Sequence, residues 1–397
     1  MVDRILLRKY ADVLTRFALN DGKGIRKGEV VYCMVPDLAK PMYGALQESI
    51  LRAGGIPMMR LTATGFTKQY FTLANDQQLT FFPDKYLKER VKLVDHYVGI
   101  LADYDLQELK GVDPKKIFKA AEATKKVRDW QNDKEYDGKM TWTTALYGTS
   151  PMAKAAGLTL KAYWEQIIRA CFLDMPDPIK RWQEVAAEQK RVLAFLNQLP
   201  MAKLHLTAEQ IDLWLTVGEK RQWVGGGGRN IPSFELFLSP DWRGTSGIIS
   251  FNQPLYRYGY LIEGISLEFQ RGRVVKAHAH RGNQLLQEML KRPNADKVGE
   301  FSLTDARLSR ITKFMANTLF DENMGDTYGN THIALGMSYR DAYAGDPRLL
   351  TKPLMKKYGF NDSGEHTDIV STTDRKVTAV MRDSSERVIY ENGKFLV

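Results

Sequence analysis

The sequence has 397 residues, of which 44% are hydrophobic and 26% are charged. This composition is that of a globular protein and excludes extensive disorder, and the length favours two domains of roughly 100–200 residues each. The charged start at residues 1–4 is followed by no long apolar run. The sequence therefore predicts neither a signal peptide nor a membrane span, and we expect a cytoplasmic protein.

The formal net charge is +10, which raises the question of a nucleic-acid partner. The basic residues are spread along the chain in pairs such as Lys115-Lys116 and form no block with interleaved aromatic residues. A basic, solvated surface is the favoured interpretation, and a nucleic-acid-associated protein is kept as an alternative. Cys33 and Cys171 stand far apart in apolar stretches and predict buried free thiols.

The first predicted element is an amphipathic helix over residues 3–20, where apolar residues recur at helical spacing. A strand at 29–35, a helix at 39–53 and a strand at 56–61 follow, which is the order of a parallel βαβ unit. The glycine-rich residues 22–28 precede a strand and follow a helix, the reverse of a dinucleotide-binding loop. We therefore predict a helix end and a turn there, and no bound cofactor.

The character of the chain changes near residue 200. Residues 154–215 have a helical pattern broken at Pro176 and Pro178, and beyond Pro200 short strands and turns dominate. Hairpins are predicted at 265–277 and around Asn392-Gly393. The predicted organisation is an α/β domain with a small parallel sheet over residues 1–200 and an α+β domain over residues 201–397.

The histidines are the first indication of chemistry. His366 and Asp368 are two residues apart, so in an extended segment both side chains lie on one face and can bind one ion. His332 lies in a short strand-like stretch after an acidic segment. The sequence has no Gly-x-Ser-x-Gly, phosphate-loop or His-Glu-x-x-His motif. From spacing alone, a carboxylate and histidine metal site is one possibility and solvated side chains are the other.

An ordered set of segments runs through the second half of the chain: GRNIPSFELF (228–237), YLIEGI (260–265) with GRVV (272–275), VGE (298–300), NTLFDEN (317–323) with HIALG (332–336), and HTD (366–368). In these segments and in their order, the second half resembles the thermophilic metallo-aminopeptidase family, of the aminopeptidase T, aminopeptidase S and PepS type. The first half resembles the family more loosely, around residues 27–31. The resemblance implies a C-terminal metallopeptidase domain that removes single residues from peptide N-termini, and a homodimer.

The resemblance also implies the residues of the site. The implied metal ligands are Glu235, Glu300, Glu322, His332, His366 and Asp368. It further implies that Glu300 bridges two divalent ions and that Tyr339 lines the active site as a hydrogen-bond donor. Oxygen-rich sites with imidazole suit Zn²⁺, Co²⁺ or Mn²⁺, and a bridging water on two such ions is a strong nucleophile.

The sequence departs from the family pattern at two places. Phe234 stands where relatives carry glycine or glutamate, so the proton acceptor is Glu235 or a bridging hydroxide. The segment before His332 is longer than usual, which leaves Asp326 as an alternative to Glu322.

His278 and His280 form a second same-face pair without a family counterpart and are interpreted as ordinary strand residues. The remaining alternatives are a non-catalytic peptide- or metal-binding relative and another metal-dependent amidohydrolase.

Overall fold

The computed structural model describes residues 2–257 and 259–397, and the chain forms two compact units. The first unit comprises Met1–Gln183 and Gly227–Pro232, and the second comprises Glu184–Gly226 and Ser233–Val397. Among the described residues, no helix combines the length and the apolar character needed to span a membrane.

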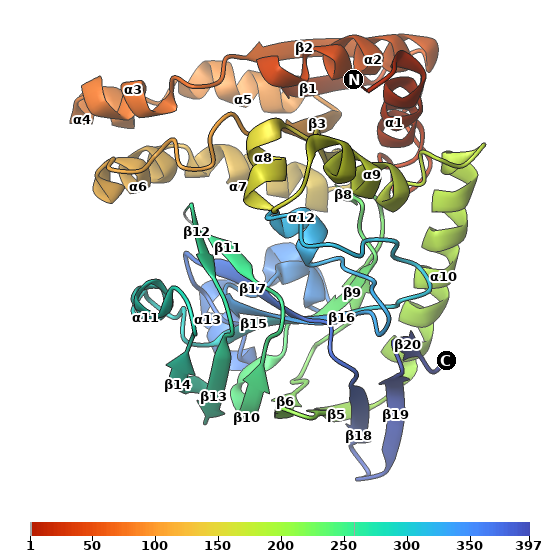
Figure 1. Ribbon diagram of the computed structural model, residues 1–397, viewed down its shortest axis with the longest axis vertical. Helices are drawn as coiled ribbons and strands as arrows, with labels where there is room; N and C mark the ends of the chain where they lie inside the picture. The colour runs from red at the N-terminus through yellow and green to blue at the C-terminus, as the bar shows by residue number, and fades with distance from the viewer. Residues whose placement is uncertain (1, 258) are drawn as a thin grey trace. The chain divides into compact units, whose positions relative to one another are not determined.

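The first unit is built around a five-stranded parallel sheet with the order β2-β1-β3-β4-β8. Strands β1, β2, β3 and β8 of this sheet are labelled in Figure 1. Strand β1, helix α2 and strand β2 form the βαβ unit that the sequence predicts. The elements of this unit are α1 (Arg4–Arg16), β1 (Val30–Pro36), a 3₁₀ turn (Asp37–Ala39), α2 (Lys40–Arg52), β2 (Ile56–Thr62), α3 (Thr67–Leu73), α4 (Asp76–Thr80), α5 (Asp84–Leu93), β3 (His96–Leu101), α6 (Pro114–Ala123), α7 (Lys125–Tyr136), β4 (Thr141–Leu146), α8 (Ser150–Ala155), α9 (Leu160–Ala170) and β8 (Asn230–Ile231).

The second unit contains two antiparallel sheets and a separate hairpin. Helix α10 (Pro178–Gln198) leads into it. An eight-stranded sheet has the order β14-β13-β10-β6-β5-β18-β19-β20, and a five-stranded sheet has the order β17-β16-β15-β9-β7. The elements are β5 (Met201–Ala208), β6 (Ile211–Thr216), β7 (Val224–Gly225), β9 (Glu235–Leu238), β10 (Asp241–Ser250), β11 (Leu255–Arg257), β12 (Tyr260–Ile262), β13 (Ser266–Gln270), β14 (Arg273–His278), α11 (Asn283–Leu290), β15 (Val298–Thr304), α12 (Thr318–Asp321), β16 (Asn330–Gly336), 3₁₀ turns (Arg340–Ala342 and Pro347–Leu349), α13 (Lys352–Tyr358), β17 (His366–Ser371), β18 (Lys376–Met381), β19 (Glu386–Glu391) and β20 (Lys394–Phe395).

One hydrophobic core joins residues from both sheets of the second unit. The five-stranded sheet contributes one of its faces to this core, with Leu236, Phe301, Leu303, Ile333 and Ile369 all fully or almost fully buried. Side chains alternate along a strand, so the residues between these positions point to the opposite face. That opposite face carries the polar side chains described below.

The predicted fold class is confirmed, with one error in the elements. The helical pattern predicted over residues 154–215 ends at Gln198, and β5 and β6 occupy most of the remainder. Leu204 and Leu206 on β5, and Leu213 and Leu215 on β6, are buried at every second position. This period of two is that of strands, and packing against the second sheet outweighs the helical spacing of the same apolar residues.

The two predicted hairpins are confirmed. β13 and β14 pair around residues 271–272, and β19 and β20 pair around Asn392-Gly393. Asn392 and Gly393 both have positive φ, as a two-residue turn between twisted strands requires. Cys33 and Cys171 are both buried and free, as predicted.

Candidate metal centre

Four neighbouring strands place acidic and imidazole side chains on one face of the five-stranded sheet. In the register, Thr304 on β15 pairs with Glu235 on β9. Glu300 on β15 pairs with Ala334 on β16, and Ala334 pairs with Asp368 on β17. Paired residues share a face, as do residues two apart on one strand. The residues that this pattern brings to the face opposite the core are Glu235, Glu300, His332, His366 and Asp368.

The imidazole of His332 lies among three carboxylates. Its Nε2 atom is 2.9 Å from Oε1 of Glu300, 3.4 Å from Oε2 of Glu235 and 3.9 Å from Oδ1 of Asp368. His332 is fully buried and the Glu300 side chain is 3% exposed. Charged groups are seldom buried so deeply unless they are paired or bind a metal ion.

A second set of donors shares Glu300 with the first. Nε2 of His366 is 3.2 Å from Oδ1 of Asp368 and 4.0 Å from Oε2 of Glu300. The ligand atoms of Glu235, Glu300 and His332 lie within 4.8 Å of one another, and so do those of Glu300, His366 and Asp368. Glu300 is the residue that the two groups have in common.

Both histidines are oriented by the nitrogen that faces away from the carboxylates. Nδ1 of His332 is 3.2 Å from the carbonyl oxygen of Glu322, and Nδ1 of His366 is 2.9 Å from the carbonyl oxygen of Met337. In each ring Nδ1–H donates to the carbonyl, so the lone pair of the neutral ring is on Nε2. A backbone acceptor on the far nitrogen is the usual support of a metal-binding histidine.

The donor set fits a divalent metal. Oε2 of Glu300 is buried and has no hydrogen-bond partner among the described residues. Such an atom is costly in a protein interior because it has lost its water, and a bound cation removes the cost. Carboxylate oxygens combined with imidazole nitrogens are typical of zinc, cobalt and manganese sites.

The clustered charges shift the pKa values of the side chains in the cluster. Burial lowers the pKa of His332, but the hydrogen bond to Glu300 and the charges of Glu235 and Asp368 outweigh burial and raise it to about 9. Burial likewise lowers the pKa of His366, and the adjacent Asp368 is the main cause of its net rise to about 9. Burial and the neighbouring carboxylates raise the pKa of Glu235 to about 8. Without a bound cation, His332, His366 and Glu235 therefore keep their protons to a higher pH than the same side chains would in water.

Glu322 interacts electrostatically with the cluster, whereas Asp326 is exposed. Glu322 is 8% exposed, and burial together with the charges of Glu235, Asp368 and Glu300 raises its pKa well above the usual range. Its carboxylate does not join either three-residue group in the described part of the chain. Asp326 is exposed on a turn with a φ of 43°. Of the two alternatives, Glu322 is the one that the fold places beside the other predicted ligands.

Tyr339 borders the cluster from the segment after β16. Its ring centroid is 4.7 Å from that of His366 and 5.7 Å from that of Phe237. The residue is 37% exposed, so its ring is packed on one side and open on the other. Its backbone N–H donates to Oγ of Ser239 at 3.0 Å, which fixes the start of the following turn.

Phe234, the residue that departs from the family pattern, is buried. It is 1% exposed, and its backbone N–H donates to Oδ1 of Asn323 at 2.6 Å. This hydrogen bond links the segment that carries Glu235 to the segment that carries Glu322, because Phe234 precedes Glu235 and Asn323 follows Glu322. Asn323 lies within the LFDEN stretch but is not among the predicted site residues, because an amide next to a ligand carries no metal-binding signal of its own.

His278 and His280 are not part of the candidate metal centre in the described residues. Both are exposed, their ring centroids are 5.6 Å apart, and neither joins a group of three potential ligands in the described residues. Their interpretation as ordinary residues at the end of β14 agrees with this exposure.

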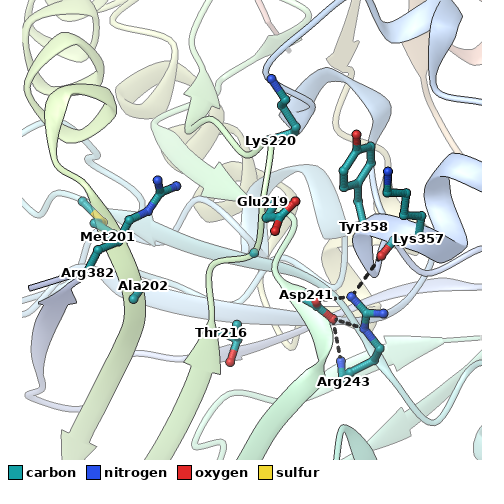
Figure 2. A pocket seen from close by; sticks show the side chains of 11 residues that line it. Met201, Ala202, Thr216, Glu219, Lys220, Asp241, Arg243, Lys357, Tyr358 and Arg382 are labelled. Atoms are coloured by element: carbon teal, nitrogen blue, oxygen red, sulfur yellow. Dashed lines mark hydrogen bonds and ion pairs between the residues drawn. The ribbon is translucent and has the colours of Figure 1, made fainter. Parts of the chain in front are cut away.

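The second unit also contains a large cavity, whose lining residues are drawn in Figure 2. It has a volume of about 810 Å³ and is bordered by the basic residues Lys220, Arg243, Lys357 and Arg382. Arg243 is already paired with Asp241, at 2.6 Å. None of the residues that line this cavity belongs to the cluster around Glu300.

Comparison with known proteins agrees with this geometry. The thermophilic metalloprotease (M29) family matches residues 4–395. The chain belongs to that family. As an M29 protein it is a metallo-aminopeptidase, a hydrolase of peptide bonds, and the family implies a divalent metal cofactor. The family predicted from the sequence is thus confirmed.

The M29 relatives are named aminopeptidases. Aminopeptidase T of Thermus thermophilus is 26% identical to this chain and covers 98% of each sequence. Aminopeptidase AmpS of Bacillus subtilis is 27% identical over 72% of this chain and 73% of its own. The solved structure of wild-type AmpT from Thermus thermophilus superimposes with a TM-score of 0.83 over 99% of each chain at 24% identity, which shows the same M29 fold.

Proposed function

We propose that this enzyme releases N-terminal residues from peptides with a water molecule activated between two divalent metal ions. The observation that carries the proposal is the position of Glu300 in both three-residue groups of donors. A carboxylate with two oxygens can bind one cation through each. We assign Glu235, Glu300, Glu322, His332, His366 and Asp368 as the ligands, within a catalytic domain over residues 201–397.

The chemistry that a bound pair of ions supplies is polarisation of the scissile carbonyl and a hydroxide at neutral pH. The protein's own part is to keep the donors in place and the site largely free of water. His332 and His366 are held by backbone carbonyls, and Glu235, Glu300 and Asp368 lie at fixed positions in the register of one sheet. Fixed donors need no reorganisation when charge develops in the transition state.

Tyr339 is assigned a role in stabilising the transition state. Burial and the charges of Glu300 and Asp368 raise the pKa of Tyr339, so the phenol keeps its proton at neutral pH. Its ring is held against His366, and from there its hydroxyl can donate a hydrogen bond to the oxygen that becomes negative. Phe234 has no acidic group, so Glu235 would be the residue that accepts the proton of the attacking water, or the nucleophile would already be a hydroxide with no proton to transfer in that step.

Hydrolysis of aminoacyl-p-nitroanilides tests the assignment. We expect turnover in the presence of Zn²⁺, Co²⁺ or Mn²⁺, and its loss in a His366→Ala, Asp368→Ala variant. A His278→Ala, His280→Ala variant is the matched control, because it removes two exposed imidazoles away from the cluster. Equal rates in the wild type and the His366→Ala, Asp368→Ala variant would overturn the catalytic assignment.

Three further parts of the proposal concern the state of the enzyme. We propose Zn²⁺, Co²⁺ or Mn²⁺ as the native metal, a homodimer as the working form and the cytoplasm as its location. Elemental analysis of the purified protein should find two metal ions per chain. Light scattering coupled to size-exclusion chromatography should give twice the chain mass of 45.3 kDa.

A further inference from the structure

Arg257 reaches the metal centre from outside the sheet that carries it. It ends strand β11, which lies beside β17 but belongs to a separate hairpin. Its Nη2 atom donates to the carbonyl oxygen of His366 at 3.2 Å. The same Nη2 lies 3.6 Å from Oε2 of Glu365. Arg257 thus contacts the backbone at a candidate ligand and the side chain of the residue before it.

Glu365 links Arg257 to a second arginine. Its other oxygen, Oε1, accepts a hydrogen bond from Nη1 of Arg292, and the Glu365 side chain is 11% exposed. The side chains of Arg257 and Arg292 are each 31% exposed. A carboxylate held between two partly buried guanidinium groups restrains the chain at the point where β17 begins.

Strand β17 needs this restraint because it is an edge strand. Within the described five-stranded sheet it pairs with β16 alone, and His366 is its first residue. Strand ends at a sheet edge are held by fewer hydrogen bonds than strands with two neighbours. The side chains of both His366 and Asp368 leave from this strand, so a shift of its start would move two donors together.

We propose that Arg257 is a positioning residue of the metal centre, which fixes the start of β17 through the His366 carbonyl and so aims His366 and Asp368 at the ion they share. The inference rests on the proposed function of that site. Arg257 contacts the backbone of a ligand residue rather than the metal, so its removal leaves every donor atom present. The expected defect is in the geometry and strength of binding.

Titration of metal-free protein with Co²⁺, followed by visible absorption, tests the role independently of activity. We expect Arg257→Gln to weaken Co²⁺ binding by about 10–100-fold, the range for residues that support metal ligands, and to alter the spectrum. Arg257→Lys keeps the charge but not the planar fork, and we expect it to restore part of the affinity. With the metal saturating, kcat should fall more than KM rises.

Arg292→Gln is the matched control. Arg292 has the same exposure as Arg257 and the same carboxylate partner, and its bond goes to Glu365. We expect a much smaller change in Co²⁺ affinity than for Arg257→Gln. Equal losses in the two variants would overturn the specific role of the His366 carbonyl contact.

A His366→Ala variant distinguishes a failure of the positioning role of Arg257 from a failure of the proposed metal site. If it loses Co²⁺ affinity while Arg257→Gln binds as the wild type does, the positioning role is wrong and the site assignment stands. If His366→Ala itself binds Co²⁺ like the wild type, the proposed site is wrong. Should Arg257→Gln fail to fold by circular dichroism, folded Arg257→Lys decides: a changed Co²⁺ spectrum supports the role, and an unchanged spectrum and affinity overturn it.

Discussion

Glu300 and His332 lie on adjacent antiparallel strands and meet diagonally, with Oε1 of Glu300 2.9 Å from Nε2 of His332. The register places Glu300 opposite Ala334, two residues beyond His332. Because diagonal neighbours on one face are within reach of long side chains, this register brings together two candidate ligands that are 32 residues apart in the sequence. The other oxygen of Glu300 is buried and has no hydrogen-bond partner among the described residues.

Replacing Glu300 by glutamine tests its place in both groups of donors. Glu300→Gln keeps the size and removes the charge, and we expect kcat/KM to fall by at least about 100-fold because a shared ligand matters more than the residues that support it. Elemental analysis should find less than two metal ions per chain. Glu268→Gln, on β13 and paired with Lys276, should behave as the wild type.

The small side chain of Ala334 is predicted to leave room for the metal ions. It is fully buried, and its side chain lies between Glu300 and Asp368 on the neighbouring strands. We expect Ala334→Leu to abolish Co²⁺ binding while circular dichroism shows a folded protein, since the larger side chain occupies the ligand face. Ala334→Ser is the control and should bind Co²⁺. Tight binding by the leucine variant would contradict this account.

Metal binding should release protons at neutral pH. In the metal-free protein the pKa values of His332 and His366 are raised to about 9, so both rings are protonated at pH 7 and metal must displace those protons. Apparent affinity should therefore increase as the pH rises towards 9 and decrease as it falls. Calorimetric titration in two buffers with different ionisation enthalpies counts the released protons. Equal counts at pH 7 and well above pH 9 would show that the histidines bind no proton at neutral pH.

The core face of the same sheet should affect stability rather than catalysis. Leu303 on β15 is fully buried among apolar residues, on the side away from Glu300. We expect Leu303→Ala to lower the free energy of unfolding by about 2–5 kcal/mol, because it leaves a cavity. Denaturant unfolding measures this loss. At temperatures where the variant is folded, its kcat should stay near that of the wild type, and a large fall would mean that the two faces are not independent.

Both cysteines should be unreactive in the folded protein. Burial raises the pKa of Cys33 and of Cys171 to about 12, so the reactive thiolate is scarce at neutral pH and a reagent has no access. A disulfide reagent such as dithionitrobenzoate should label no thiol in native protein and two after denaturation. Rapid labelling of the native enzyme would show that one of these regions opens.

Much of the fold and part of the site follow from local patterns in the sequence. The strand, helix, strand order at residues 30–62 and the Asn392-Gly393 turn depend on periodicity and on turn residues, which act over a few positions. The spacing of His366 and Asp368 already implies a common face, because side chains alternate along a strand. The ordered family motifs indicate the remaining candidate ligands.

The convergence of those ligands required the tertiary structure. Strand register is set by pairing between distant segments, so nothing in a local pattern places Glu300 opposite Ala334 or shows that Glu300 is shared. The strands at 201–216 show the same limit, because their leucines suit a helix until a second sheet packs against them. Arg257 belongs to no motif and acts through a backbone carbonyl 109 residues away. Local spacing in the sequence predicts the face of a strand or helix on which a side chain lies. Which side chains from distant segments come into contact depends on the packing of the whole unit.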